Sequence, residues 1–600
     1  MKKTNHTPTK TIGQSILSFR TRQAEKAVIF KKSSAWHSKT WPAYYNDIKN
    51  LGAGLVSLGV TPQDRVAIMS STRYEWSVMD LAIMGIQAVV VSVYQNSTSD
   101  DIQFILNNSE AKILILENTS ALKTWLKIQK SCPSVQHVIV IDDDPLNQTK
   151  ILKWDQVLEK GVALLKTSPN TFENLCSEIT PEHIATLLYT SGTTGIPKGV
   201  VITHTQVISE VSEAFPIFGV DHNDLSLTFL PYAHVMGRIE HWGHAFMGFT
   251  MAYAENIEKL RNNLIEIRPT FLISVPRIFE KVYSAIGAQV DSSPVKKRLF
   301  KWAVNVGCQI TELKLTRQTI PLDLLVTYEL AKKLALNKVT AAFGGRLRFA
   351  ISGGAPLSSE ISTFFHAAGV LILEGYGLTE TTAAITINTP FNYKFGSVGR
   401  PIGDVKLKIA DDGEVLVRSQ KVMREYYKNP EASAEVFTDG WFHTGDIGTL
   451  LQGGDLKITD RKKDLIKTAG GKYVAPQKLE GLLKLHPLIS QVLISGDKMK
   501  YIIALITLDR VNLENFAKIE NISFTDWTDL TQSPQIQDII RDQIAETNSQ
   551  LASYESIKRF LILPVEFTVE GGDLTPSLKV KRKALTQKYS KEINSLYGES

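Results

Sequence analysis

Alternating helical and extended patterns between Thr40 and Leu116 limit the fold of this chain more than any other feature. Apolar residues recur at helical spacing from Asp47 to Leu58, and Arg65 to Met69 is a short apolar strand. A helical pattern over Asp101 to Asn107 then precedes an apolar strand over Lys112 to Leu116. Because strand-helix-strand connections place successive strands parallel in one sheet, this order predicts a mainly parallel sheet covered by helices.

Two later regions extend this prediction. The same alternation recurs from Leu225 to Val275, which indicates a second helix-covered sheet. From Val405 to Leu451 the segments become short and alternating, and the turn sequences Asp411-Asp412-Gly413 and Asp439-Gly440 separate them. Such spacing is typical of antiparallel hairpins and predicts a small β-subdomain at about 400–458.

The length of 600 residues exceeds what one ordinary core supports, so several units are expected. After Asp460-Arg461-Lys462-Lys463 the composition shifts to a shorter α+β pattern, and we expect a hinge there. The predicted fold class is therefore α/β, with a large N-terminal domain of helix-covered sheets over residues 1–460. The small β-subdomain belongs to it, and a small mobile α+β C-terminal domain follows over residues 461–600.

Charge and cysteine usage exclude some functions. The formal net charge of +6 is small for this length and demands no nucleic acid partner. Cysteines are few and widely spaced (Cys132, Cys176 and Cys308), which is typical of a reducing compartment. The polar start Met1 to Lys10 predicts no export signal, and the apolar run Leu81 to Tyr94 is shorter than a membrane span. We therefore expect a cytoplasmic protein.

One segment, Val295 to Thr340, is helical in pattern and basic. Its charged residues alternate with Leu, Phe and Trp, and they are Lys296, Lys297, Arg298, Lys301, Lys314 and Arg317. Such a helix pair either touches the inner face of a membrane or presents a solvated outer face. The pattern favours the solvated face, and peripheral membrane contact stays open.

The sharpest chemical signal is the segment Tyr189-Thr-Ser-Gly-Thr-Thr-Gly-Ile-Pro-Lys-Gly199, which follows the apolar run Ile184 to Leu188. Small residues and hydroxyl groups let a backbone wrap phosphate oxygens, and Lys198 adds positive charge. The spacing differs from GxxxxGK[ST], which disfavours the P-loop of kinases and motors. A plain turn is the alternative, but the length of the pattern favours a phosphate loop.

This loop resembles the signature loop of the adenylate-forming superfamily, which includes acyl-CoA synthetases, luciferases and peptide-synthetase adenylation domains. The resemblance covers roughly Thr40 to Leu585. Matching motifs follow in the expected order at Ser352 to Pro356, Glu374 to Glu380, Gly440 to Asp446, Asp460 to Lys467 and Gly470 to Lys472. Segments similar to the long-chain fatty acyl-CoA synthetase branch are Phe229 to Val235, Ser274 to Lys281 and Gly344 to Arg348.

The resemblance implies an ATP site with assigned roles. Tyr376 would stack on adenine, Thr379 would touch the α-phosphate and Glu380 would hold Mg²⁺. Asp446 would accept hydrogen bonds from the ribose hydroxyls, and Arg461 would also reach the ribose. The other implied ATP- or AMP-binding residues are Thr190, Ser191, Gly192, Thr193, Thr194, Gly195, Lys198, Gly353, Gly354, Ala355, Glu374, Gly375, Gly377 and Ile458.

Two further residues are implied to act in catalysis. The segment Thr575 to Arg582 resembles the loop that carries the adenylation lysine, which we assign to Lys579. Leu578 stands where the family has Gly, so Lys581 remains the alternative register. His234 resembles a histidine that this family keeps at the acyl pocket, although a lone His is more often a satisfied structural residue.

The resemblance also implies a route for CoA. Lys463 would be the hinge about which the small domain turns, although a solvated charge run is the alternative for Lys462 and Lys463. Gly470 and Gly471 lack side chains and could line a narrow passage for the pantetheine arm. Lys467 and Lys472 would lie beside that passage.

The predicted reaction needs no covalent enzyme intermediate, since the chain has no Gly-x-Ser-x-Gly elbow and no cysteine in a motif. A long-chain fatty acid would react with ATP and Mg²⁺ to give acyl-AMP and pyrophosphate, and CoA would then give acyl-CoA and AMP. Lys579, Glu380, Thr379 and His234 would be the catalytic residues. Alternatives are a carrier-protein thiol as acceptor, another hydrophobic acid, luciferase-like oxidation and a non-catalytic sensor. No protein partner is required.

Overall fold

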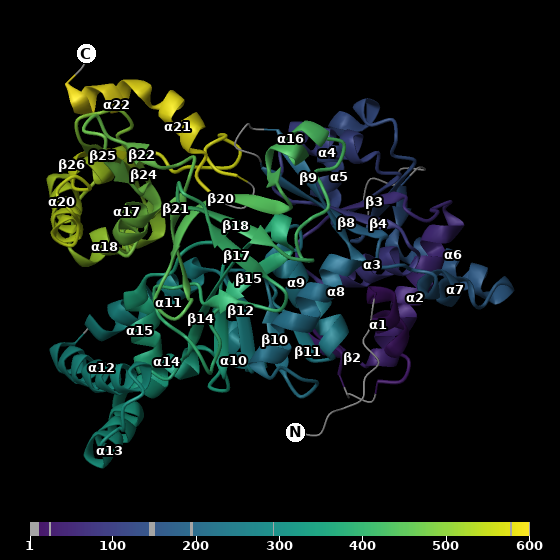
Figure 1. Cartoon of the computed structure of the whole chain (residues 1–600), viewed down its shortest axis with the longest axis horizontal. Helices are drawn as coiled ribbons and strands as arrows, with labels where there is room; N and C mark the ends of the chain where they lie inside the picture. The colour runs from purple at the N-terminus through teal and green to yellow at the C-terminus, as the bar shows by residue number, and fades with distance from the viewer. Residues whose placement is uncertain are drawn as a thin grey trace.

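The computed structural model describes residues 11–22, 26–142, 151–191, 196–291, 293–575 and 579–598. Figure 1 shows a large body built from the N-terminal three quarters of the chain, and a smaller domain that holds α17 to α22 at its side. The predicted fold class, α/β with a large N-terminal and a small C-terminal domain, is confirmed.

The predicted parallel sheet has seven strands in the order β7-β6-β5-β3-β4-β8-β9. Neighbouring pairs are parallel except for β8 and β9, which form an antiparallel hairpin. The strands are β3 (Arg65–Met69), β4 (Val89–Val93), β5 (Ile113–Leu116), β6 (His137–Val140), β7 (Ile151–Lys153), β8 (Ile184–Ser191) and β9 (Pro197–Thr203). The connecting helices are α2 (Trp41–Ser57), α3 (Tyr74–Gly85), α4 (Ser99–Ser109), α5 (Thr119–Ile128), α6 (Trp154–Thr167) and α7 (Thr171–Ser177).

Two further sheets complete the large body. One has the order β10-β11-β1-β2 and the other the order β12-β13-β14-β15-β16. Their strands are β1 (Val28–Lys32), β2 (Ala35–Lys39), β10 (Leu225–Thr228), β11 (Thr250–Tyr253), β12 (Phe271–Ser274), β13 (Phe349–Ser352), β14 (Ile372–Leu378), β15 (Ala383–Ile387) and β16 (Arg400–Pro401). Helices here are α1 (Ile12–Ser18), α8 (His204–Ala214), α9 (Val235–Met247), α10 (Leu260–Ile267), α11 (Pro276–Asp291) and α15 (Ser359–Ala367).

Helix α9 lies inside this body and carries a buried ion pair. Arg238 Nη2 lies 2.7 Å from Asp80 Oδ1 of α3, and both side chains are fully buried. The Arg238 guanidinium also lies over the rings of Trp76 and Trp242. Because a buried charge must be compensated, these contacts fix the position of α9 and of His234 at its start.

The predicted β-subdomain is an antiparallel sheet of β17 (Lys406–Ile409), β18 (Glu414–Arg418), β19 (Phe437–Thr438), β20 (Trp441–Leu450) and β21 (Leu456–Arg461). Helix α16 (Pro430–Glu435) precedes β19. The hairpins form where Asp439-Gly440 and Asp411-Asp412-Gly413 were expected to turn, and positive φ angles occur at Asp439, Gly440 and Gly413. Strand β20 pairs with β18, β19 and β21 and so occupies the middle of this sheet.

The C-terminal domain is a three-stranded sheet with helices. Its strands are β24 (Ile489–Ser495), β25 (Ile502–Leu508) and β26 (Ile557–Leu563), and a separate hairpin joins β22 (Ile466–Lys467) to β23 (Tyr473–Val474). Its helices are α17 (Pro476–Leu483), α18 (Arg510–Ile519), α19 (Trp527–Gln532), α20 (Pro534–Ser549), α21 (Arg582–Lys588) and α22 (Ser590–Tyr597). Buried apolar side chains form two clusters of its own.

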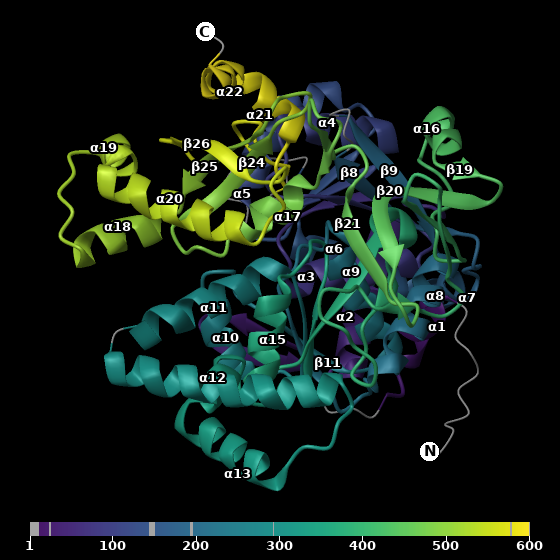
Figure 2. The same cartoon turned by 60° about the vertical axis from the view of Figure 1, so that its left-hand side comes forward.

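The basic segment forms a helical projection (Figures 1 and 2). It consists of α12 (Pro294–Leu315), α13 (Leu322–Ala331), a π-helical turn (Lys332–Leu336) and α14 (Asn337–Ala342). Helix α12 approaches α15 closely at Gly307, where a Cβ atom would lie 2.4 Å from Ala367 O. Among the helices of the described residues, none combines the length and apolar character needed to cross a bilayer.

Candidate active site

The predicted phosphate loop connects β8 to β9. Thr190 lies opposite Lys198 in the register of this hairpin, and Lys198 Nζ lies 5.0 Å from the ring centroid of Tyr426. Residues that lie outside the described part of the chain are Gly192, Thr193, Thr194 and Gly195, and the Ser191 side chain is not described either. The described strand β9 contacts the segment that contains Tyr426, since Val200 bridges to Tyr426.

Predicted residues after β13 and along β14 lie at one edge of their sheet. Gly353 and Gly354 line a cavity, and Gly354 has φ +81°, a conformation that glycine adopts without strain. Ala355 follows them and is exposed. Because ligands of open α/β sheets bind beyond the carboxyl ends of the strands, this edge is where a ligand is expected.

The glycine pair that flanks Tyr376 has a packing role. A Cβ atom on Gly377 would lie 1.5 Å from Ala383 O of β15, so no larger residue fits there. A Cβ atom on Gly375 would lie 3.0 Å from the Ile387 side chain. The close approach of β14 and β15 therefore requires Gly377, a reason that the sequence pattern did not reveal.

Tyr376, Asp446 and Arg461 form a connected group between two sheets. The Tyr376 hydroxyl donates to Asp446 Oδ2 at 2.6 Å, and Arg461 Nε lies 2.9 Å from Asp446 Oδ1. Asp446 and Arg461 face each other in the register of β20 and β21. Burial raises the pKa of Asp446, while Arg461, the Tyr376 hydrogen bond and Lys579 act against this rise. The predicted ribose- and adenine-binding residues therefore lie together.

Lys579 reaches this group from the C-terminal domain. Its backbone is held by Thr575, whose Oγ1 accepts from Lys579 N at 3.0 Å and whose N donates to Lys579 O at 2.8 Å. The Lys579 side chain is solvent-accessible. The pKa of Lys579 is lowered, first by desolvation and then by the positive charge of Arg461, while the carboxylates of Asp446 and Glu380 act in the opposite direction. Lys579 thus lies within electrostatic reach of the acidic groups.

Glu380 lies in the short 3₁₀ turn Thr379–Thr381 after β14. The Tyr426 hydroxyl donates to Glu380 Oε1 at 2.9 Å, and Met423 N donates to Glu380 O at 2.7 Å. Among the described residues no three His, Cys, Asp or Glu side chains group as a metal site. Since Mg²⁺ is usually held by one or two carboxylates together with phosphate oxygens, the single Glu380 carboxylate fits this mode.

Two other predicted residues, the buried Glu374 and the half-buried His234, have shifted pKa values. Glu374 accepts from Leu357 N at 3.2 Å, and burial raises its pKa to about 7 despite this bond. Burial, and secondarily Lys579, lowers the pKa of His234 to about 4. His234 Nδ1 accepts from Met236 N at 3.2 Å and caps α9, so the neutral ring carries its proton on Nε2.

A narrow apolar cavity extends from this edge into the large body. His234 and Tyr376 line one part of it. Its apolar lining includes Phe215, Phe218, Val220, Ile239, Phe271 and Phe349. Sequence reasoning did not find these side chains, because they come from separate helices and strands. Such a cavity can enclose a hydrocarbon chain next to the group formed by Tyr376 and Asp446.

The predicted hinge follows a well-anchored residue. Lys462 Nζ lies 2.6 Å from Asp412 Oδ2 and 2.9 Å from Glu414 Oε2. These ion pairs hold Lys462 against the β-subdomain, while its side chain is 44% exposed, as expected of a solvated charge. Lys463, the predicted hinge, is the next residue and is exposed.

The predicted pantetheine residues occupy an exposed turn of the C-terminal domain. Gly471 has φ +73° and donates to Thr468 O at 2.8 Å. Lys467 N donates to Asp497 Oδ1 at 3.1 Å, and Lys467 Nζ lies 5.5 Å from the Tyr473 ring. Gly470 and Lys472 belong to the same exposed turn. Ile458, predicted at the nucleotide, packs partly against the large core.

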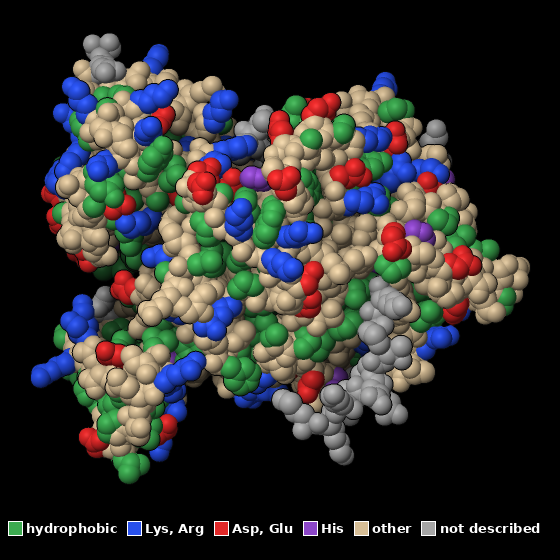
Figure 3. Space-filling view, in the orientation of Figure 1, with side chains coloured by type: hydrophobic (Ala, Val, Ile, Leu, Met, Phe, Trp, Pro, Cys, Tyr) green, Lys and Arg blue, Asp and Glu red, His purple; other side chains and the backbone are tan. Residues whose placement is uncertain are grey.

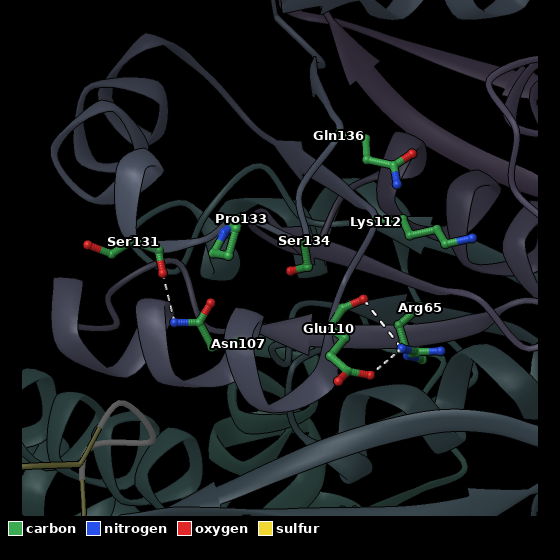
Figure 4. Close-up of a pocket in the computed structure, with 8 residues that line it drawn as sticks. All are labelled: Arg65, Asn107, Glu110, Lys112, Ser131, Pro133, Ser134 and Gln136. Carbon is green, nitrogen blue, oxygen red and sulfur yellow. Dashed lines mark hydrogen bonds and ion pairs between the residues drawn. The ribbon is translucent and has the colours of Figure 1, made fainter.

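A second, shallow hollow lies near the amino ends of β3 and β5 (Figure 4). Arg65 and Lys112, which precede or begin β3 and β5, are among its lining residues. Arg65 donates to Ser109 O at 2.6 Å and pairs with Glu110 at 3.0 Å, and Lys112 pairs with Asp64 at 2.7 Å. Because its cations already have partners, this hollow is a weaker candidate for an anionic ligand.

Comparisons with known proteins match this chain over most of its length. A sequence family described as AMP-binding enzyme matches residues 18–427, and one described as AMP-binding enzyme C-terminal domain matches residues 463–600. The long-chain-fatty-acid–CoA ligase FadD15 of Mycobacterium bovis is 37% identical over 576 residues, which cover 95% of this chain and 94% of that protein. The peroxisomal long chain acyl-CoA synthetase 7 of Arabidopsis thaliana is 31% identical, and the match covers 92% of this chain and 80% of that protein.

A solved structure shows the same fold. The adenylation domain of a carboxylate reductase from Mycobacterium chelonae superposes with a TM-score of 0.75 at 23% identity. The match covers 99% of this chain and 92% of that domain. It supports the arrangement of a large and a small domain.

Proposed function

The chain belongs to the AMP-binding enzyme family and is a long-chain fatty acid–CoA ligase, and from this premise we propose how its residues divide two half-reactions. One observation carries the proposal: the group formed by Tyr376, Asp446 and Arg461 lies next to an apolar cavity that Tyr376 itself lines. Fatty acid, ATP and CoA are the substrates.

In the first half-reaction a carboxylate oxygen of the fatty acid attacks the α-phosphorus of ATP, and pyrophosphate leaves. Lys579 spreads the negative charge that builds up on the α-phosphate and draws the carboxylate toward it. Thr379 offers a hydroxyl to the same phosphate, and Glu380 would hold Mg²⁺, which neutralises phosphate charge when bound. The Tyr426 hydroxyl keeps the Glu380 carboxylate in place.

The nucleoside part is held by the group that joins two sheets. Asp446 would accept hydrogen bonds from the ribose hydroxyls, with Arg461 beside it, and the ring of Tyr376 would stack on adenine. The acyl chain occupies the apolar cavity, where Phe215, Phe218 and Phe349 exclude water from it. Neutral His234 can donate from Nε2 to an oxygen of the acyl group.

The second half-reaction needs different groups at the same adenylate. The CoA thiol attacks the acyl carbonyl carbon, AMP leaves and a thioester forms. The turn with Gly470, Gly471, Lys467 and Lys472 makes each of its described contacts within the C-terminal domain. Since Lys462 is bound to the β-subdomain, we propose that rotation at Lys463 withdraws Lys579 and brings this turn to the adenylate.

AMP release tests the substrate assignment. Purified protein with ATP and Mg²⁺ is offered acids from acetate to oleate, with either CoA or a phosphopantetheinylated carrier protein as acceptor. We expect CoA-dependent AMP release that is greatest for the long acids. Release only with the carrier protein, or only with short acids, contradicts the assignment.

A further inference from the structure

Helix α13 presents an apolar side to solvent. Large side chains recur on it and on the π-helical turn that follows, at spacings of one, three or four residues, and together we call them the α13 stripe. Its members, with their exposed fractions, are Leu322 (81%), Leu325 (38%), Val326 (70%), Leu330 (50%) and Leu334 (47%). The opposite side of the helix packs inward through Tyr328 and Ala331. A contiguous exposed apolar surface of this kind marks a contact site for another molecule.

The surroundings of the stripe are strongly basic. Residues 294–340 contain nine Lys or Arg and three Asp or Glu, an excess equal to the formal charge of +6 of the whole chain. The cations exposed there are Lys296, Lys297, Arg298, Lys301, Lys314, Arg317, Lys333 and Lys338. Figure 3 shows apolar side chains at the tip of the projection and cations on its sides. The rest of the chain is neutral overall, so this charge is local.

The few acidic side chains of the segment do not cancel this charge. Glu329 lies within the stripe, and Lys332 Nζ is 2.7 Å from its carboxylate. A second copy of the chain is disfavoured as the partner, because a symmetric contact through the stripe would bring two basic flanks together. A negatively charged surface with an apolar interior satisfies both the stripe and the cations.

We propose that the α12–α13 projection docks on the surface of an anionic phospholipid bilayer. The α13 stripe would lie at the boundary between headgroups and acyl chains, and the cations of α12 and of the adjoining turns would meet lipid phosphates. The projection leads through α14 to β13, whose Phe349 and Ile351 line the apolar cavity. Docking would hold the enzyme at the phase in which long-chain acids dissolve, a benefit that rests on the proposed function.

Vesicle co-sedimentation tests the proposal. Full-length protein is mixed with vesicles of phosphatidylcholine alone or of phosphatidylcholine with phosphatidylglycerol. We expect binding to the anionic vesicles that weakens as salt increases. The triple variant Leu322→Gln/Val326→Gln/Leu330→Gln should bind the anionic vesicles at least about tenfold more weakly than the parent does. A matched control, Val511→Gln/Ile519→Gln, removes two side chains of the C-terminal domain that are 69% and 75% exposed and should bind as the parent does.

Other readouts separate docking from catalysis and from self-association. Without vesicles, AMP release with a soluble medium-chain acid should be the same for the parent and the triple variant, which also shows that the variant is folded. Parent protein that ignores anionic vesicles, or a triple variant that binds them as well as the parent, overturns the proposal. So does a parent dimer in sedimentation velocity that the triple variant abolishes, because the stripe would then serve a second copy.

Discussion

The Tyr376 hydroxyl lies 2.6 Å from Asp446 Oδ2 and connects β14 of one sheet to β20 of another. Arg461 Nε lies 2.9 Å from the other carboxylate oxygen of Asp446, Oδ1. Asp446 is buried, so both of its oxygens depend on these partners. The two residues assigned to the nucleoside are therefore positioned by each other before any ligand arrives.

Replacing Tyr376 by Phe tests this relationship. Phe keeps the ring for stacking but leaves Asp446 Oδ2 without its donor, a loss of about 1–2 kcal/mol. We expect the KM for ATP to rise by roughly 5- to 30-fold, with a smaller change in kcat. Tyr473→Phe, at an exposed tyrosine of the C-terminal domain, is the matched control. An unchanged KM for ATP in Tyr376→Phe would show that the hydroxyl does not position the site.

Lys579 should be needed for only one half-reaction. Lys579→Ala removes the cation near the α-phosphate, and we expect pyrophosphate release from ATP and fatty acid to fall at least about 100-fold. Conversion of a supplied acyl-adenylate and CoA to the thioester should persist.

Lys581→Ala is the control for this variant. The backbone N of Lys581 donates to Asp573 O at 2.9 Å at the start of α21, and this bond survives the substitution. Lys581→Ala should therefore leave adenylate formation intact. If Lys581→Ala stops adenylation and Lys579→Ala does not, the assignment of the lysine is wrong.

The buried pair of Asp80 and Arg238 should matter for stability. Asp80→Ala leaves the fully buried guanidinium without a counter-charge, and we expect a loss of about 3–5 kcal/mol in the free energy of unfolding of the large domain. The double variant Asp80→Leu/Arg238→Met removes both charges and should lose less. Denaturant titrations followed by circular dichroism measure both, and a single variant as stable as the parent contradicts the expectation.

Glu240 should make stability depend on pH. Burial raises its pKa to about 7 from the ordinary 4.5, against the effect of Thr228 and Ser226. The folded protein then keeps a proton that the unfolded chain releases, so this contribution is present below pH 4.5 and is lost as pH rises to 7.

Glu240→Gln removes this titration. Its stability relative to the parent should therefore increase between pH 4.5 and 7, by at most about 1.4 kcal/mol per pH unit. Thermal melting at several pH values measures the difference. A stability difference between the two proteins that does not change with pH would show that the pKa of Glu240 is not raised.

Local elements could be predicted from the sequence more completely than their arrangement. Strand β3 has the predicted bounds, whereas the helix expected over Asp47 to Leu58 begins at Trp41, because Thr40 caps it and Pro42 fits its first turn. The alternation predicted parallel neighbours but not their order, in which β4 lies between β3 and β8. Strand order depends on which apolar faces pack, and this information is spread along the chain.

The same limit applies to the site. Tyr376 and Asp446 were predicted because each lies in a short contiguous motif that resembles one of the family, and the structure brings the two residues together. Tyr426 has no motif of its own. Lys421 is fully buried between Glu210 at 3.0 Å and Glu213 at 2.8 Å, although its sequence context suggests a surface residue. Both glutamates lie on α8, so the burial of this lysine depends on tertiary packing.

Exchange of labelled pyrophosphate into ATP tests the central claim most directly, because it reports reversible adenylate formation without CoA. With a long-chain fatty acid and Mg²⁺, the purified protein should catalyse exchange that depends on the acid. Lys579→Ala should not. Absence of exchange with every acid offered would contradict the account.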